Sequence, residues 1–417
     1  MKHGFLKGLV TGIAVTLVVS FGVRMASYFV GDIFQISGRN EEAVGGEVSF
    51  KDMVTDDEFV KKCDVLNNYI NEYYLNRDEI SEKDINRGMF RGVMDSLGDK
   101  YAAYYDSDEY NSFMEGAKGQ YGGIGTYVTQ NISTGEIVIV NPFEGAPADK
   151  AGIKSGDLLV EVDGKSVQGL ELDDIVAMMK GEEGTSVTLG VERDGNRLSI
   201  DVVRELVNVP TVLYEVLKDS NVGYIQVLSF ESVTCNQFEE AVNAMESANV
   251  DGIIIDLRNN GGGLVDSVVK MLDRILPEGL VMYTETNKGR DEEYFSTAEQ
   301  SYSKPYVVLI NQYSASASEV FAGAVQDFGY GTLVGTKSYG KGVVQSIIPL
   351  HGVNDGSAIK LTTAKYFTPK GRNIDGIGIE PDVVVEYDEN SVVEGDKISI
   401  DNQMQRAIEV IKEKTGK

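Results

Sequence analysis

Apolar and polar residues follow two different spacings along this chain, and the change between them divides it into segments. Between Phe50 and about Phe113, apolar side chains recur at steps of three and four residues, which is typical of amphipathic helices. From Gly119 onward, short alternating stretches are separated by turns such as Asp163-Gly164 and Asp194-Gly195, a typical hairpin signal. The spacing therefore predicts a helical region followed by a compact domain of mixed strands and helices.

Beyond Val207, apolar strands and amphipathic helices alternate, which predicts an α/β core. Helices are expected at about 237–247 and 265–275. Strands are expected at 223–230, 252–257, 280–284, 306–310 and 332–335. The stretch 399–414 places Met404, Ala407 and Ile411 on one face, so we expect a final amphipathic helix there.

The N-terminus has its own pattern. Lys2 and Lys7 precede an apolar run from Gly8 to Val23, and Arg24 follows it. A charged region and an apolar core of about 16 residues without a clear cleavage site predict an uncleaved signal anchor rather than a buried core helix. The excess of lysine before the run predicts that the chain body lies outside the cytoplasm. We therefore expect a single-pass protein of the cell membrane with an extracytoplasmic body.

Composition limits the classes of partner and of cofactor that are expected for this chain. A chain of 417 residues is long enough for two or three domains, and its net charge of −27 argues against nucleic acid and anionic membrane surfaces as partners. Cys63 and Cys235 lie far apart, so a disulfide between them stays open. With two cysteines and two histidines the sequence does not predict a zinc site, and we expect no metal or cofactor.

The stretch 305–345 offers candidate chemistry. Its apolar strand leads to three alternating serines at the start of a helix, and Lys341 follows between two glycines. One interpretation is that Ser316 is a nucleophile presented at the helix N-terminus and activated by Lys341. The other is that Ser316 and Glu319 form a capping box and that Lys341 is a solvated loop residue.

The histidine count favours lysine as the base, if one of these serines is catalytic. Apart from His3 at the extreme N-terminus, only His351 is available for a Ser-His-Asp arrangement, and the chain has no G-x-S-x-G motif. A phosphate-binding loop is also excluded, although 335–341 matches most of its pattern. Gly342 stands where Ser or Thr must hold magnesium, and the residues after it are strand-like rather than helical.

Two glycine-rich stretches remain. The loop 122–125 precedes a strand-like segment. The amides of such a loop can hold a carboxylate, and the edge of the adjoining strand can accept a peptide. The alternative is that this loop is an ordinary turn. The stretch 259–263 lies between an apolar strand and a helix. Its amides are placed to face an oxyanion or a phosphate, unless this is a plain strand-to-helix turn.

These segments together resemble a known family. SASASE at 314–319 and GKGVVQ at 340–345 closely resemble the active-site signature of the carboxyl-terminal processing peptidases, or tail-specific proteases. DLRNNGGG at 256–263 and TTAKYFTPKGRNIDGIGIEPD at 362–382 resemble two further family signatures. GGIGTYV at 122–128 and APADKAGIKSGDLLVEVDGKSV at 146–167 look like the PDZ domain of these enzymes. The resemblance covers nearly everything after about residue 55, in the family's order.

The resemblance implies a role for each matching residue. Ser316 corresponds to the nucleophile, Lys341 to the general base and Gln345 to the residue that orients the lysine. The oxyanion amides would be those of Ala317 and Gly262. The implied activity is that of a serine endopeptidase that acts by acyl transfer and needs no cofactor.

The resemblance also implies partners. Gly122, Gly123, Ile124 and Gly125 would capture the C-terminal carboxylate of protein substrates, with a preference for an apolar last side chain. Family members gate their catalytic site with this domain and many form homodimers through their helical ends, so a homodimer and an activating partner are expected here. Nucleic acid is not expected as a partner. The opposing class, a non-catalytic PDZ scaffold, would need none of Ser316, Lys341 and Gln345.

The expected fold is an α/β catalytic core of ClpP/crotonase type with an inserted PDZ domain and helical segments at both ends. The expected domains are a signal anchor at 1–30, a linker at 31–49, a helical region at 50–115, a PDZ domain at 116–206, a peptidase core at 207–390 and a C-terminal helical segment at 391–417.

The proposed base imposes a physical condition. Lys341 must be neutral near pH 7 to accept a proton, whereas a free lysine has a pKa of about 10.4. Burial against Val343 and Val344 and a shortage of nearby carboxylates are expected to lower its pKa. Gln345 would hold the amine without adding a charge that keeps it protonated.

Overall fold

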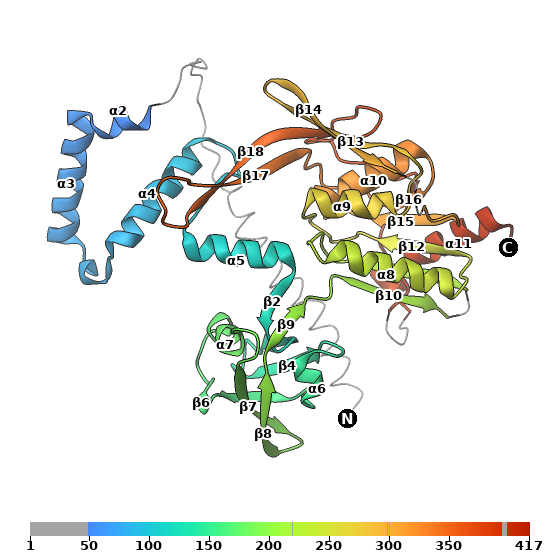
Figure 1. The fold of residues 1–417 in the computed structure, drawn as a ribbon, viewed down its shortest axis with the longest axis horizontal. Helices are drawn as coiled ribbons and strands as arrows, with labels where there is room; N and C mark the ends of the chain where they lie inside the picture. Colours follow the sequence, from blue (N-terminus) through green and yellow to red (C-terminus); the bar gives the residue numbers. More distant parts are fainter. Residues whose placement is uncertain (1–48, 219, 298, 300, 394–397) are drawn as a thin grey trace. The chain divides into compact units, whose positions relative to one another are not determined.

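The computed structural model describes residues 49–218, 220–297, 299, 301–393 and 398–417 (Figure 1). The chain divides into two compact units, residues 1–104 and 105–417, which we describe separately. The signal-anchor segment 1–30 and the linker up to residue 48 lie outside the described residues.

The described part of the first unit is helical, as the spacing predicts. Its helices begin at side-chain caps: Ser49, Asp56 and Ser81 each accept a hydrogen bond from a backbone N–H of the first turn, which satisfies groups that have no helical partner. The elements are α2 (Phe50–Val54), α3 (Asp57–Tyr73), η2 (Arg77–Glu79) and α4 (Glu82–Ser96), with the short strand β1 (Ala103–Tyr105) at the boundary between the units.

The prediction of a single-pass membrane protein is corrected by the helices. Across residues 49–417, apart from the undescribed positions, no helix is long and apolar enough to cross a bilayer. The longest of the helices described, α3, has 17 residues and carries charged side chains, including Asp57, Glu58 and Lys61. A membrane span needs about 20 mostly apolar residues.

A small antiparallel sheet forms the first domain of the second unit. Its strands, in sheet order, are β3 (Thr126–Gln130), β4 (Ile137–Pro142), β5 (Leu158–Val162), β7 (Ser186–Arg193) and β8 (Asn196–Val203), with β6 (Lys165–Ser166) beside β5. The helices α6 (Pro147–Lys150) and α7 (Leu172–Met179) pack Ala148, Ile175 and Met179 into one apolar core with the strands. The strands expected from the alternating pattern are confirmed.

Two antiparallel strands flank this domain in the sequence. Helix α5 (Ser107–Lys118) ends at Gly119 and leads into β2 (Gln120–Gly123), which pairs with β9 (Glu205–Asn208). The chain therefore enters and leaves the small domain through neighbouring strands.

The α/β core is built on a six-stranded sheet in which all neighbours are parallel except the first pair. The strand order is β10 (Val212–Leu217), β11 (Val222–Val227), β12 (Gly252–Asp256), β15 (Tyr306–Ile310), β16 (Thr332–Gly335) and β19 (Val383–Val384). Every residue of β12 and β15 is buried, and successive side chains of a strand point to opposite faces, so both faces of the sheet are apolar. Figure 1 shows helices on both sides of this sheet.

Helices cover the two faces of this sheet. Ile253, Ile255 and Val308 pack against α8 (Thr234–Ser247), α9 (Val265–Asp273) and α10 (Ala317–Phe328). Ile254 and Val307 face the other way, against α11 (Asn402–Thr415). This layering explains why the strands are apolar throughout rather than alternating.

A second sheet of the core was only partly anticipated from the sequence. Strand β13 (Gly279–Thr286) pairs on one side with β14 (Gly289–Ser296) and on the other with β18 (Ala358–Phe367), which also pairs with β17 (Val343–Pro349). Figure 1 shows β17 and β18 running side by side as a hairpin. The apolar pattern does not predict β18, because this strand contains polar residues such as Thr362, Thr363 and Lys365. A short 3-10 helix, η3 (Glu389–Ser391), follows β19.

A buried ionic network joins the last helix to the parallel sheet. Arg258 Nη2 lies 2.7 Å from Asp256 Oδ2, and Arg258 Nη1 lies 2.7 Å from Asp401 Oδ2. Asp401 also caps α11 by accepting from Met404 N, and Tyr224 donates to Asp256 at 2.8 Å. Burial raises the pKa of Tyr224, and the carboxylate of Asp256 raises it further. The network fixes α11 on the sheet.

The parallel strands end at one edge. The loop 257–263 follows β12, the loop 311–316 follows β15, and the segment 336–342 follows β16. Ligands and reacting groups collect at this edge in α/β sheets because neighbouring loops meet there.

Candidate active site

Exposure distinguishes the three alternating serines. Ser314 and Ser318 are fully buried, and their hydroxyls donate to Leu257 O and Asn260 O, each at 2.8 Å. Both side chains are therefore used to bind the 311–318 segment to the loop after β12. Ser316 is the only one of the three that is not buried.

The backbone at Ser316 is unusual. Its φ of 57° and ψ of −116° lie outside the regions that a residue with a side chain ordinarily occupies. Strained backbone of this kind is found at active sites, where the surrounding structure must hold it in place. Ser316 comes directly before α10, so the positive end of the helix dipole lies at this residue.

Glu319 holds Ser316, as the capping-box interpretation predicted, but it does more. Its side chain is fully buried, and Oε2 accepts from Ser316 N at 3.0 Å and from Lys341 N at 2.8 Å. Oε1 accepts from Ser338 Oγ at 2.6 Å and from Gly340 N at 2.7 Å. The carboxylate thus joins the start of α10 to the glycine-flanked lysine.

Electrostatics near Lys341 differs from the expectation. Instead of a shortage of carboxylates, Glu319 contacts the backbone of Lys341 and Asp375 Oδ1 accepts from Gly342 N at 3.1 Å. Burial raises the pKa of Glu319, while its four hydrogen bonds lower it, with burial the larger effect. Four donors disperse the negative charge of the ionised carboxylate.

Tyr366 is a second link between the two loops. Its buried hydroxyl lies 2.7 Å from Lys341 O and 3.1 Å from Ser316 O. No local pattern in the sequence predicts this contact, because Tyr366 lies in a strand whose place is set by pairing with β13.

Gln345 lies on β17, just after an irregularity in the pairing of β17 with β18 between Val344 and Gln345. Such irregularities re-aim side chains and are common beside active sites. The side-chain amide of Gln345 donates to Val343 O at 3.4 Å. Its role toward Lys341 stays a prediction.

Gly262 lies against the residues around Ser316. A Cβ added at Gly262 would lie 2.7 Å from Ala315 O, 2.8 Å from Ser316 Cβ and 3.0 Å from Ala317 N, and its φ is +103°. Glycine is therefore required by both space and conformation. The Gly262 amide donates to Asn260 Oδ1 at 2.9 Å.

Asn260 organises this loop and was not singled out from the sequence. It is fully buried, and its side-chain NH₂ group donates to Val227 O at 2.8 Å while its backbone carbonyl accepts from Ala315 N at 3.0 Å. Asn260 thereby fixes the glycines beside the serine segment. Asp327 has a structural position: it accepts from Lys370 N at 2.9 Å and pairs with Arg372.

The loop 122–125 is tightly packed. An added Cβ would lie 2.3 Å from Gly181 O at Gly122, 2.6 Å from the Tyr121 ring at Gly123 and 2.5 Å from Ala146 Cβ at Gly125. These glycines are thus needed for packing, which the turn interpretation allows. The loop leads into β3, which among the strands of the described residues pairs with β4 alone and so lies at the edge of its sheet.

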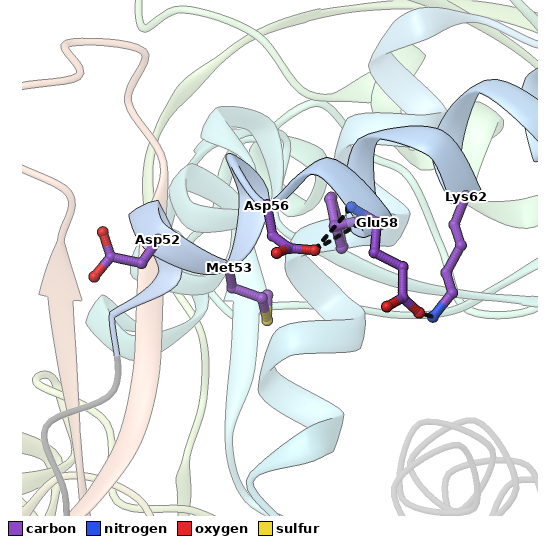
Figure 2. A pocket seen from close by; sticks show the side chains of 6 residues that line it. Asp52, Met53, Asp56, Glu58 and Lys62 are labelled. Carbon is purple, nitrogen blue, oxygen red and sulfur yellow. Dashed lines mark hydrogen bonds and ion pairs between the residues drawn. The ribbon is translucent and has the colours of Figure 1, made fainter.

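A surface pocket lies in the first unit, on α2 and α3, and is lined by Asp52, Met53, Asp56, Glu58, Phe59 and Lys62 (Figure 2). Asp56 caps α3, and Lys62 pairs with Glu58 at 2.7 Å. None of the residues singled out for chemistry lines it, and Asp56, Glu58 and Lys62 stabilise the helix on which they lie.

The comparisons with known proteins decide the family. Residues 221–385 match the model of peptidase family S41, and residues 138–193 match that of the PDZ domain. The chain is 38% identical over 303 residues to a carboxy-terminal-processing protease of Bartonella bacilliformis, which covers 71% of this chain and 68% of that protein. The chain belongs to the carboxyl-terminal processing peptidases of family S41. It is a serine-type peptidase, as the resemblance implied.

Other comparisons agree. The carboxy-terminal processing protease CtpA of Bacillus subtilis is 37% identical over 317 residues, or 76% of this chain and 66% of that protein. A solved chain from Bacteroides fragilis assigned to the S41 proteases is 14% identical, with a TM-score of 0.50 over 84% of this chain and 96% of that one. This likeness concerns the fold alone. The finer ClpP/crotonase assignment and the predicted domain limits stay predictions.

Proposed function

We propose that this S41 peptidase uses a Ser316–Lys341 dyad and selects its protein substrates by their C-terminal tails. The observation that carries the dyad is the joint attachment of Ser316 and Lys341 to Glu319. Ser316 is in addition the one serine of its segment that is not committed to buried hydrogen bonds.

In the proposed reaction, Ser316 Oγ attacks the carbonyl carbon of the scissile peptide bond and its proton passes to Lys341 Nζ. The amide of Ala317, with Gly262 beside it, stabilises the tetrahedral oxygen, a role in which preorganised backbone donors are effective. When the C–N bond breaks, Lys341 returns the proton to the leaving amine. Water then releases the acyl group from Ser316 by the same steps in reverse.

Gln345 is proposed to orient the Lys341 amine. A neutral amide is suited to this because a carboxylate would keep the amine protonated. Since Glu319 and Asp375 already contact the backbone beside Lys341, a further charge at position 345 would work against catalysis.

For tail selection, the support is the free edge of β3 directly after the 122–125 loop. An extended peptide can add to such an edge with its terminal carboxylate at the loop amides. The amides of Gly125, in the loop, and of Thr126, the first residue of β3, hydrogen-bond to the Tyr121 hydroxyl and lower its pKa, although burial raises it more. A homodimer and an activating partner remain proposals from the family resemblance.

The test uses one unstructured reporter protein made with two C-termini, one apolar and one ending in Asp-Asp. The full chain and its Lys341→Ala and Ser316→Ala variants are incubated with each, and products are read by gel and mass spectrometry. We expect cleavage of the apolar-tailed reporter only, lost in both variants. Turnover at the wild-type rate in either variant would refute the dyad.

Tail capture needs a test that does not alter the loop, because any side chain at Gly125 would meet Ala146 and disturb the fold. We therefore compare an apolar-ending peptide with its C-terminally amidated form. Equal binding of the two would exclude carboxylate capture. Binding of the free acid without any cleavage would favour a non-catalytic scaffold.

A further inference from the structure

The hydroxyl of Tyr366 touches both predicted catalytic segments without being one of the reacting groups. It comes from β18, where Tyr366 pairs with Thr284 of β13 and its backbone N–H donates to Gly342 O at 3.1 Å. The side chain is 2% exposed. Its backbone is therefore held both by β13 and by Gly342, the residue that follows Lys341.

The two carbonyls that meet this hydroxyl are not equivalent. Ser316 O already accepts from Glu319 N at 2.8 Å and from Val320 N at 2.9 Å, as the first carbonyl of α10. A hydroxyl has a single proton to donate. The shorter distance, 2.7 Å to Lys341 O against 3.1 Å to Ser316 O, assigns this proton mainly to Lys341.

The backbone around Lys341 is held on both sides. Gly340 N donates to Glu319 and Gly342 N donates to Asp375, and the absence of side chains at these glycines permits the close packing. Glu319 fixes the N–H of Lys341 and Tyr366 its C=O. With both groups held, the start of the lysine side chain has a defined position relative to Ser316.

We propose that Tyr366 is a positioning residue that holds Lys341 in register with Ser316 for proton transfer. The inference rests on the proposed Ser-Lys mechanism. Tyr366 does not contact the substrate in this role and transfers no proton itself. Its removal should slow the chemical step and leave substrate binding unchanged, because displacements of about 1 Å can cost about 100-fold in rate.

The test compares Tyr366→Phe with Tyr306→Phe. Tyr306 is also buried, and its hydroxyl has no hydrogen-bond partner among the described residues, so it controls for loss of a buried phenol oxygen. We expect Tyr366→Phe to lower kcat by about 10- to 100-fold with KM within about twofold. Labelling of Ser316 by a fluorophosphonate should slow in parallel. Tyr306→Phe should keep wild-type kinetics.

A double-mutant cycle then separates positioning from a general structural effect. If Tyr366 acts through Lys341, adding Tyr366→Phe to Lys341→Ala should not reduce the residual rate, followed by mass spectrometry over long incubations. Equal kcat in Tyr366→Phe and wild type, or additive losses in the double variant, would overturn the proposal. Failure of the dyad itself would be recognised separately, as wild-type turnover in Lys341→Ala alone.

Discussion

The backbone nitrogens of Ser316 and Lys341 donate to the same oxygen, Oε2 of the fully buried Glu319, at 3.0 and 2.8 Å. One carboxylate thus sets the distance between a strained serine and a lysine from a separate loop. Hydrogen bonds to a buried charge are among the stronger ones in proteins. Predictions about activity and about stability both follow from this arrangement.

The first prediction separates the three serines. Ser316→Ala should abolish peptide cleavage and keep the unfolding free energy within about 1 kcal/mol, because its hydroxyl lies outside the core. Ser314→Ala and Ser318→Ala should each cost about 1–1.5 kcal/mol, since each removes one buried hydrogen bond while the carbonyls of Leu257 and Asn260 keep a backbone donor. Urea unfolding and reporter cleavage measure both. Full activity in Ser316→Ala would show that a residue other than Ser316 is the nucleophile.

Glu319→Gln should impair both folding and activity. Each carboxylate oxygen of Glu319 accepts from two donors. Whichever oxygen the NH₂ group of glutamine replaces, two N–H or O–H donors would lose their acceptor and face another donor. We expect a loss of about 3 kcal/mol or more in unfolding free energy and a fall in kcat. The exposed Glu240 supplies a matched control, Glu240→Gln, which should change neither. Wild-type stability in Glu319→Gln would show that the carboxylate charge is not needed.

The same pair of proteins gives a pH test. Because burial raises the folded-state pKa of Glu319, the folded state binds more protons than the unfolded state between the ordinary glutamate value and the raised one. The stability advantage of wild type over Glu319→Gln should therefore be largest at the acid end of this window and decrease as pH rises through it. Urea titrations between about pH 4 and 7 measure the difference. An advantage that grows with pH would mean that the hydrogen bonds outweigh burial.

Gly262→Ala should reduce turnover strongly. The methyl group would come within 3.0 Å of Ala315 O and Ser316 Cβ at a φ of +103°, so the serine segment must shift. A fall in kcat of about 100-fold is expected from a shift near 1 Å. Gly289→Ala, also at positive φ but with no atom within 4 Å of the new methyl, controls for backbone strain. Equal kinetics in both variants would contradict a role for the close approach at Gly262.

Arg258→Ala should destabilise the core by about 3–5 kcal/mol, because Asp256 and Asp401 would be left as buried charges without their partner. Arg406, on α11, pairs with Glu409 and Glu413 at the surface. Arg406→Ala should therefore cost less than about 1 kcal/mol. Denaturant unfolding of the two variants provides the comparison. Similar unfolding midpoints would show that the ionic network does not hold α11 on the sheet.

Local patterns were sufficient for much of the fold. The strands at Tyr306–Ile310 and Thr332–Gly335 agree with the structure to the residue, since a continuous apolar run bounded by polar turns leaves little choice of ends. Strand β18 was missed because its side chains are largely polar and its place is set by pairing with β13 and β17. The membrane prediction rested on residues outside those described, and no described helix supports it.

The sequence by itself determined the family, the α/β alternation and the candidate residues, because motifs and periodicity are properties of neighbouring positions. Only the tertiary structure decided which serine of the three is available and what joins it to Lys341. Glu319 was predicted as a helix cap and nothing more, and Asn260 and Tyr366 were not singled out at all. Their contacts cross between loops and sheets distant in sequence. Such contacts depend on how the strands are ordered in space, and spacing along the chain does not encode that order locally.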